Sequence, residues 1–107
     1  MMWMNETLNQ RIYDLTRKAL HTDDPDEISR IIWEFEDIVQ VEGYGLPLQK
    51  AFLLWESKKI SDDRLSIFLE DCYRWASELD EAKASALRDE VMRWTFRMLW
   101  RVTRPVR

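Results

Sequence analysis

Apolar side chains recur at helical spacing along almost the whole chain, and only two glycines and three prolines in 107 residues interrupt them. In the first segment the spacings are four, three, four and one, which is typical of one face of a helix. The residues with this spacing are Leu8, Ile12, Leu15, Ala19 and Leu20. An all-β fold needs many more turn-forming residues. The sequence therefore predicts an all-α fold, a single-domain bundle of four to five helices with short connections over residues 1–107.

Residues that favour helix ends set the expected boundaries of the first two helices. Asn5 is expected to cap the first helix. Asp24, followed by Pro25, predicts the start of the second helix, and Glu27 completes an acidic form of the capping box. Gly43 predicts the end of that helix, because glycine readily adopts the left-handed conformation that terminates helices.

The second half of the chain is expected to hold one short helix and then one or two longer ones. Pro47 opens the short helix, whose apolar side chains cover most of its circumference and indicate a central element or an interface. Ser61 is expected to cap the next helix. The apolar stripe changes phase near Asp80, which predicts a turn there, with one continuous helix as the alternative. The last helix, residues 81–103, would be about 35 Å long, so that its final turns overhang the bundle.

Charge is distributed unevenly along the chain. Residues 93–107 contain five arginines and no acidic residue, whereas residues 1–92 contain 11 basic and 20 acidic side chains, so the two parts carry +5 and −9 and the whole chain −4. The arginines are Arg93, Arg97, Arg101, Arg104 and Arg107. Because a guanidinium pairs with carboxylate or phosphate and stacks on aromatic rings, this segment is the clearest candidate for a binding surface.

On a helical projection most of these arginines form one stripe, which Trp94 and Trp100 border. Three interpretations of the stripe remain open. It could pair internally with acidic residues on one face of the second helix, namely Asp26, Glu34 and Asp37. It could contact a partner protein, since Trp and Arg are the residues most enriched at binding hot spots. It could also contact nucleic acid or an anionic membrane surface, although the acidic body of the protein repels phosphates and disfavours both.

The sequence offers little for catalysis or metal binding. One cysteine and one histidine exclude a disulfide framework and a cysteine-based zinc site. Cys72 lies within an apolar stripe and is expected to be inert core, and His21 is expected to help end the first helix. The paired carboxylates lack calcium-loop spacing, and no nucleophile stands beside a base. We therefore expect no metal, no cofactor and no enzymatic activity.

The tryptophans divide into two groups. Trp33, Trp55, Trp75 and Trp94 fall on or beside apolar stripes and are expected in or near the core. Trp3 and Trp100 lie near the ends of the chain, where an indole is least covered, and indicate a surface for a partner. No apolar run approaches the roughly 20 residues of a membrane span, and no signal peptide is visible. A cytoplasmic location is therefore expected.

The sequence thus predicts a small, non-catalytic regulatory or adaptor protein that binds a protein partner through its C-terminal helix. The candidate partner-binding residues are Trp94, Arg97, Trp100, Arg101, Arg104, Trp3 and Tyr44. A homodimer is expected if Met98, Trp100 and Val102 overhang and need covering. One alternative is an acidic inhibitor of the immunity-protein type, which masks a basic partner with Asp26, Glu34 and Asp37. Another is nucleic-acid or membrane-surface binding through the arginine stripe.

Overall fold

The computed structural model describes the backbone of residues 2–103 and the side chains of residues 6–103. Within this part of the chain the regular structure consists of five α-helices and no strand. They are α1 (Met2–His21), α2 (Pro25–Glu42), α3 (Leu46–Glu56), α4 (Asp62–Ala76) and α5 (Glu81–Thr103). The predicted all-α fold is confirmed, and the turn before Glu81 separates α4 from α5.

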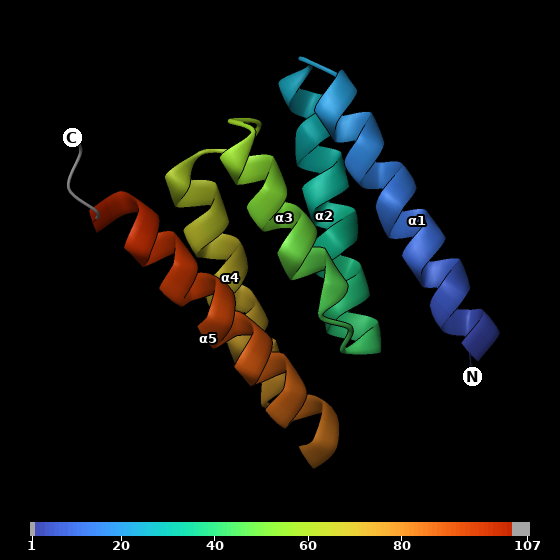
Figure 1. Cartoon of the computed structure of the whole chain (residues 1–107). Helices are drawn as coiled ribbons and strands as arrows, with labels where there is room; N and C mark the ends of the chain where they lie inside the picture. Colours follow the sequence, from blue (N-terminus) through green and yellow to red (C-terminus); the bar gives the residue numbers. More distant parts are fainter. Residues whose placement is uncertain (1, 104–107) are drawn as a thin grey trace.

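The five helices form a short two-layered array, with α1, α3 and α5 in one layer and α2 and α4 in the other (Figure 1). Each described helix packs against the next one in the chain and the next but one, and contacts no other. As a result α3 lies in the middle and contacts all four other helices. This central position explains why α3 is apolar around most of its circumference. The array measures 45 × 28 × 20 Å, with α1 at one end and the α4–α5 pair at the other.

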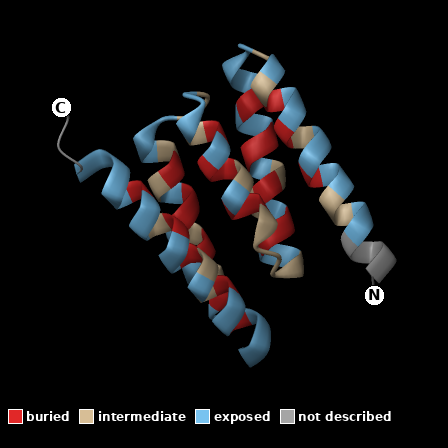
Figure 2. Ribbon diagram, in the orientation of Figure 1, coloured by how far each residue is buried: buried red, intermediate tan, exposed pale blue. Residues whose placement is uncertain are grey.

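One hydrophobic core fills the space between the helices, and the buried residues lie on the sides that face each other (Figure 2). The whole predicted stripe of α2 is buried, namely Ile28, Ile31, Ile32, Phe35, Ile38 and Val39. Cys72 of α4 is also fully buried. Burial raises the pKa of its thiol far above the usual range, and the charges of Glu36 and Asp71 raise it further. A thiol that stays protonated is a poor nucleophile, which agrees with the expected inert role.

The predicted caps of α2 and α4 are confirmed. The Asp24 side chain accepts a hydrogen bond from the N–H of Asp26 at 3.0 Å, and the Ser61 hydroxyl accepts one from the N–H of Arg64 at 3.1 Å. The capping box differs in one detail from the prediction. The N–H of Asp24 donates to the hydroxyl of Thr22 at 3.1 Å. In a capping box the side chain of Glu27 would accept this hydrogen bond. A residue before the helix thus completes the cap.

Gly43 ends α2 as predicted, with a positive φ of 65° and its N–H bonded to the carbonyl of Val39 at 2.9 Å. We expect Gly43→Ala to lower the free energy of unfolding by about 1–2 kcal/mol, because a Cβ disfavours the left-handed conformation. An added Cβ would also lie 3.1 Å from Leu79 Cδ1. Urea denaturation of Gly43→Ala and Gly43→Asn separates the two causes, since asparagine tolerates this conformation but carries the same Cβ. Equal losses in both variants would show that the Leu79 contact dominates.

Three expectations from the sequence are wrong. The first helix begins at Met2, so Asn5 lies inside α1 and does not cap it. Trp33, expected near the core, is 65% exposed, because it points away from the buried face of α2. Met98 does not overhang: it is 7% exposed and belongs to the core, whereas Val102 and Trp100 are exposed.

Candidate partner-binding groove between α3 and α5

The C-terminal half of α5 and the neighbouring α3 enclose a groove, which we call the α3/α5 groove. It is lined by Gln49, Lys50, Phe52, Leu53 and Glu56 from α3 and by Trp94, Phe96, Arg97, Trp100 and Arg101 from α5. Four of the residues that the sequence singles out therefore lie together. They are Trp94, Arg97, Trp100 and Arg101, and residues three, four and seven apart on one helix share a side in this way.

Trp94 forms part of the floor of the groove and is only 7% exposed. Its ring packs against that of Phe52, with 4.9 Å between the ring centroids, and Phe52 in turn packs against Trp55 at 5.2 Å. The indole N–H donates to Glu90 Oε2 at 3.0 Å, so the polar atom of this buried side chain is satisfied. Trp94 thus supports the groove from below and offers a partner little surface of its own.

The walls of the groove carry the apolar surface that a partner could cover. Phe96 is 71% exposed and Trp100 is 59% exposed, and Leu53 faces them from α3 at 36%. Sequence reasoning missed Phe96. The signal that could have found it is its spacing, because Met92, Phe96 and Trp100 stand four residues apart on the outward side of α5. A second apolar row on the side away from the buried one is typical of a helix that packs against a second surface.

The cations around the groove are held in fixed positions. The guanidinium of Arg97 lies over the Trp94 ring, 4.7 Å from its centroid, and Lys50 lies over the Tyr13 ring at 4.3 Å. Arg101 forms an ion pair with Glu56 of α3. Cation–π contacts use the face of the guanidinium and leave its N–H edge able to donate.

The internal partners of the arginine stripe differ from those that the sequence indicates. Arg93 pairs with Glu90 one turn earlier in α5, at 2.9 Å, and the partner of Arg101 lies on α3. Asp26, Glu34 and Asp37 belong to α2. This helix does not contact α5, because α3 packs against both of them and separates them. Asp26 and Asp37 are exposed, and Glu34 pairs instead with Arg11 of α1 at 3.4 Å. The groove is therefore lined by three cations, Lys50 of α3 with Arg97 and Arg101 of the stripe, and by one carboxylate, Glu56.

Gly45 helps to shape one end of this region. A Cβ at Gly45 would lie 2.9 Å from Cγ of Glu90, so the absence of a side chain lets α5 approach the connection between α2 and α3 closely. Glu90 is thereby placed where one oxygen accepts from Trp94 and the other pairs with Arg93.

Of the three remaining candidates, the structure describes the side chain of Tyr44. The Tyr44 hydroxyl donates to Asn9 Oδ1 of α1, so this half-buried residue fastens the α2–α3 connection to α1 and does not line the groove. The side chain of Trp3 and the whole of Arg104 lie outside the described residues. Four of the seven candidate partner-binding residues thus line one groove, and Tyr44 does not join it.

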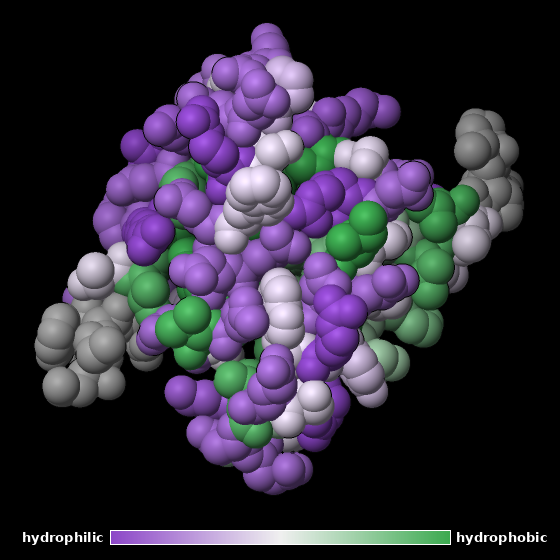
Figure 3. Space-filling view, turned by 180° about the vertical axis from the view of Figure 1, so that it is seen from behind, coloured by the Kyte–Doolittle hydropathy of each residue, from purple (hydrophilic) through white to green (hydrophobic). Residues whose placement is uncertain are grey.

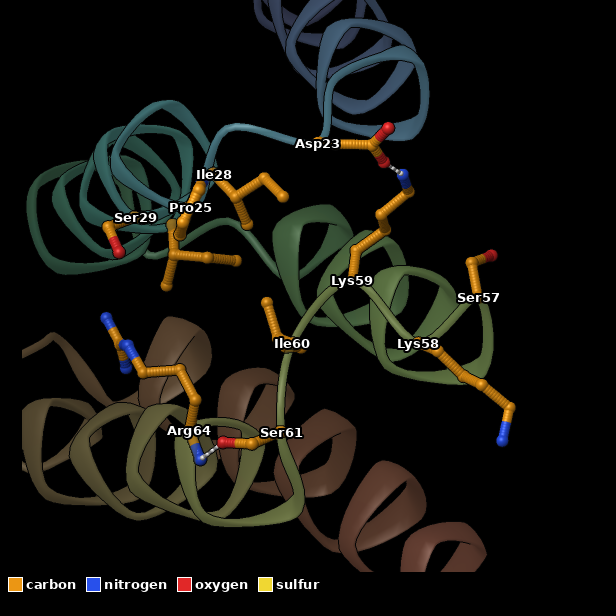
Figure 4. A pocket seen from close by; sticks show the side chains of 11 residues that line it. Asp23, Pro25, Ile28, Ser29, Ser57, Lys58, Lys59, Ile60, Ser61 and Arg64 are labelled. Carbon is orange, nitrogen blue, oxygen red and sulfur yellow. Dashed lines mark hydrogen bonds and ion pairs between the residues drawn. The ribbon is translucent and has the colours of Figure 1, made fainter.

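A second pocket lies between the start of α2, the α3–α4 connection and the start of α4 (Figure 4). Ile28, Ile32 and Ile60 form its apolar wall. Two of its cations are already engaged: Lys59 pairs with Asp23 at 3.2 Å, and Arg64 pairs with Glu36 at 3.0 Å. Lys58 points away from the hollow (Figure 4). These pairs tie α4 and the α3–α4 connection to α2 and its preceding turn, so we attribute a structural role to this pocket.

Comparison with known proteins adds no further constraint. No protein-family model matches the chain, and no curated protein and no solved structure shows significant similarity to it. None of the described helices has the length and apolar character that a membrane crossing needs. Among the described residues, no group of three or more His, Cys, Asp and Glu side chains could hold a metal ion. The α3/α5 groove is accordingly the feature from which we argue function.

Proposed function

We propose that this protein is a non-catalytic interaction protein that binds an acidic segment of a partner protein in the α3/α5 groove. The observation that supports this proposal most directly is the pairing of exposed aromatic walls with fixed cations. Phe96 and Trp100 offer apolar surface, and Arg97 and Arg101 stand beside them. An apolar side chain flanked by carboxylates fits such a surface, because each part meets its complement.

The energetics favour Trp100 as the anchor. A half-exposed indole that becomes buried gains about 25 cal/mol per Å² of apolar surface, and anchoring tryptophans commonly carry 2 kcal/mol or more of binding free energy. Arg97 needs no large rearrangement, because Trp94 already orients it. The excess of cations would mainly accelerate association with an acidic partner and exclude basic ones.

Regulation by binding, a cytoplasmic location and self-association are parts of the same proposal. A small protein that masks an acidic apolar segment of another protein acts as an adaptor or inhibitor without any chemistry of its own. Nucleic acid fits the groove less well, because the carboxylate of Glu56 lies among its cations and residues 1–92 carry a formal charge of −9.

The proposal is tested by selecting random peptides on the wild-type protein and measuring the affinity of the selected sequences. We expect peptides that combine acidic residues with one large apolar residue. Trp100→Ala should weaken their binding by about thirtyfold or more, the usual cost of losing an anchoring tryptophan. Trp33→Ala is the matched control, because Trp33 is exposed to a similar extent but lies on α2, which does not contact α5.

Two results would contradict this function. Basic consensus peptides, or equal affinities for Trp100→Ala and wild type, would exclude the groove as the binding site. Loss of binding in the double variant Glu34→Lys with Asp37→Lys, with Trp100→Ala unaffected, would instead support the alternative of an acidic inhibitor that uses the face of α2. Binding of duplex DNA or anionic vesicles that weakens steeply with salt would support the arginine stripe as a phosphate-binding surface.

A further inference from the structure

The α4–α5 pair forms one end of the helix array and has an apolar outer side. Among the described helices, α4 contacts α2, α3 and α5, and α5 contacts α3 and α4. On the side facing away from α3 they enclose a second groove, which we call the end groove. It is lined by Ser66, Leu69, Glu70 and Tyr73 of α4 and by Val91, Met92, Thr95, Met98 and Leu99 of α5. It shares no residue with the α3/α5 groove.

The end groove has a buried floor and protruding rims. Leu69, Val91 and Met98 form the floor and are at most 7% exposed. Tyr73 on one rim is 50% exposed, and on the other rim Met92 is 59% and Leu99 is 54% exposed. Seen from behind, apolar side chains gather at the edge of the molecule next to the C-terminal residues (Figure 3). A groove beside a ridge of similar side chains is complementary to itself, since the ridge of one copy can occupy the groove of another.

The exposed apolar area of this surface is close to the apolar share of a standard protein interface. Side chains of this size that are about half exposed each leave about 100 Å² in water, so Tyr73, Met92 and Leu99 together with Val102 expose on the order of 400 Å². A standard interface buries about 800 Å² on each partner, of which a little more than half is apolar. The end groove with its polar margin therefore supplies the apolar share that a stable dimer needs.

The charges decide which surface can meet a second copy. Glu70 is the single charged residue among the nine that line the end groove. Arg97 and Arg101 of α5 lie on the other flank of the helix, toward α3. Two copies that met through their α3/α5 grooves would bring Lys50, Arg97 and Arg101 of both molecules together, and like charges that lose water repel each other. Pairing through the end grooves avoids this repulsion.

The described outward side of α1, at the other end of the array, disfavours a head-to-tail contact. The outward side of α1 is polar and exposed, and its residues are Gln10, Asp14, Arg17, Lys18 and His21. An end groove packed on this surface would take charged groups out of water without partners. Self-association therefore favours contact between the same surface of two copies. A two-fold axis relates such copies, and the assembly then closes as a dimer.

We propose that two copies of this chain pair through their end grooves around a two-fold axis, with the Met92–Leu99 ridge of each copy in the groove of the other. Methionine suits this role, because its flexible thioether adapts to irregular surfaces. The pair leaves both α3/α5 grooves uncovered, on the far flank of each α5. The dimer is then a bivalent binder, whose avidity for a partner with two acidic segments exceeds the affinity of either groove.

Adjacent residues on α5 provide the test, because Leu99 lines the end groove and Trp100 lines the α3/α5 groove. Sedimentation equilibrium of the full chain should show a dimer at about 100 µM, well above the dissociation constant of a standard interface. Leu99→Asp should give a monomer with an unchanged helical circular dichroism spectrum, whereas Trp100→Asp should remain dimeric. Met92→Glu provides a second disruption of the same surface.

The outcomes separate this inference from the proposed function. A wild-type monomer at this concentration, or a dimer that survives both Leu99→Asp and Met92→Glu, would overturn the end-groove interface and leave the α3/α5 groove proposal intact. Dissociation by Trp100→Asp alone would overturn it as well, since it would place the contact on the other flank of α5. If the selected peptides bind Leu99→Asp with wild-type affinity per chain, the two surfaces act independently.

Discussion

Replacement of Leu54 by alanine should lower the free energy of unfolding by about 3 kcal/mol, within the range measured for buried leucines. Leu54 is fully buried in α3, and α3 contacts all four other helices. Because helices surround α3 on several sides, the structure can collapse little into the space that the side chain leaves. A loss of this size should lower the melting temperature by more than 10 °C, at about 4–8 °C per kcal/mol for a chain of this length.

The neighbouring residue provides a control of identical chemistry. Leu53 is 36% exposed on the wall of the α3/α5 groove, so Leu53→Ala should cost less than about 1 kcal/mol of stability. Urea denaturation with both midpoints and slopes recorded distinguishes the two variants. Similar losses at both positions would mean that α3 is not the centre of the array. Leu53→Ala should in addition weaken binding of the selected peptides, which Leu54→Ala in its folded state should not do.

Local features of the sequence determine both ends of α2 and the start of α4, and for that reason these ends could be predicted. Asp24, Gly43 and Ser61 act through hydrogen bonds and backbone angles within four residues of themselves, so no knowledge of neighbouring helices is needed. The buried stripes of α2 and α4 follow in the same way from periodicity. Trp33 shows that a position directly after a buried stripe need not be buried. It follows Ile31 and Ile32 directly, but a step of 100° carries it to the outward side of α2.

The partners of the arginine stripe could not be predicted, because they depend on which helices become neighbours. The face of α2 with Glu34 and Asp37 has suitable spacing for Arg97 and Arg101, but α3 lies between α2 and α5. Glu56 meets Arg101 only because α3 runs beside the end of α5. The same limit applies to the two grooves. Periodicity assigns apolar residues to both sides of α5, and only the packed structure shows that one side faces α3 and the other faces outward.

The contact between Glu90 and Trp94 links the stability of the fold to the shape of the α3/α5 groove. The indole N–H of Trp94 is buried, and Glu90 Oε2 accepts its hydrogen bond. Without an acceptor this N–H would remain unsatisfied, at a cost of about 1–3 kcal/mol. The ion pair of Glu90 with Arg93 is partly exposed and lies within one helical turn, so it contributes about 0.5 kcal/mol. The hydrogen bond that Glu90 accepts from Trp94 therefore contributes more to the free energy of unfolding than the charge of Glu90 does.

We accordingly expect Glu90→Ala to lower the free energy of unfolding by about 2 kcal/mol and Glu90→Gln by less than about 1 kcal/mol, because the amide oxygen of glutamine can accept the same hydrogen bond. The indole N–H resonance of Trp94 should shift in Glu90→Ala and stay close to its wild-type position in Glu90→Gln. In Glu90→Ala the Trp94 ring loses its tether, and Arg97, which lies over that ring, should lose its fixed position. Peptide binding should then weaken along with stability. Equal losses in the two variants would instead assign the effect to the charge of Glu90 and its pairing with Arg93.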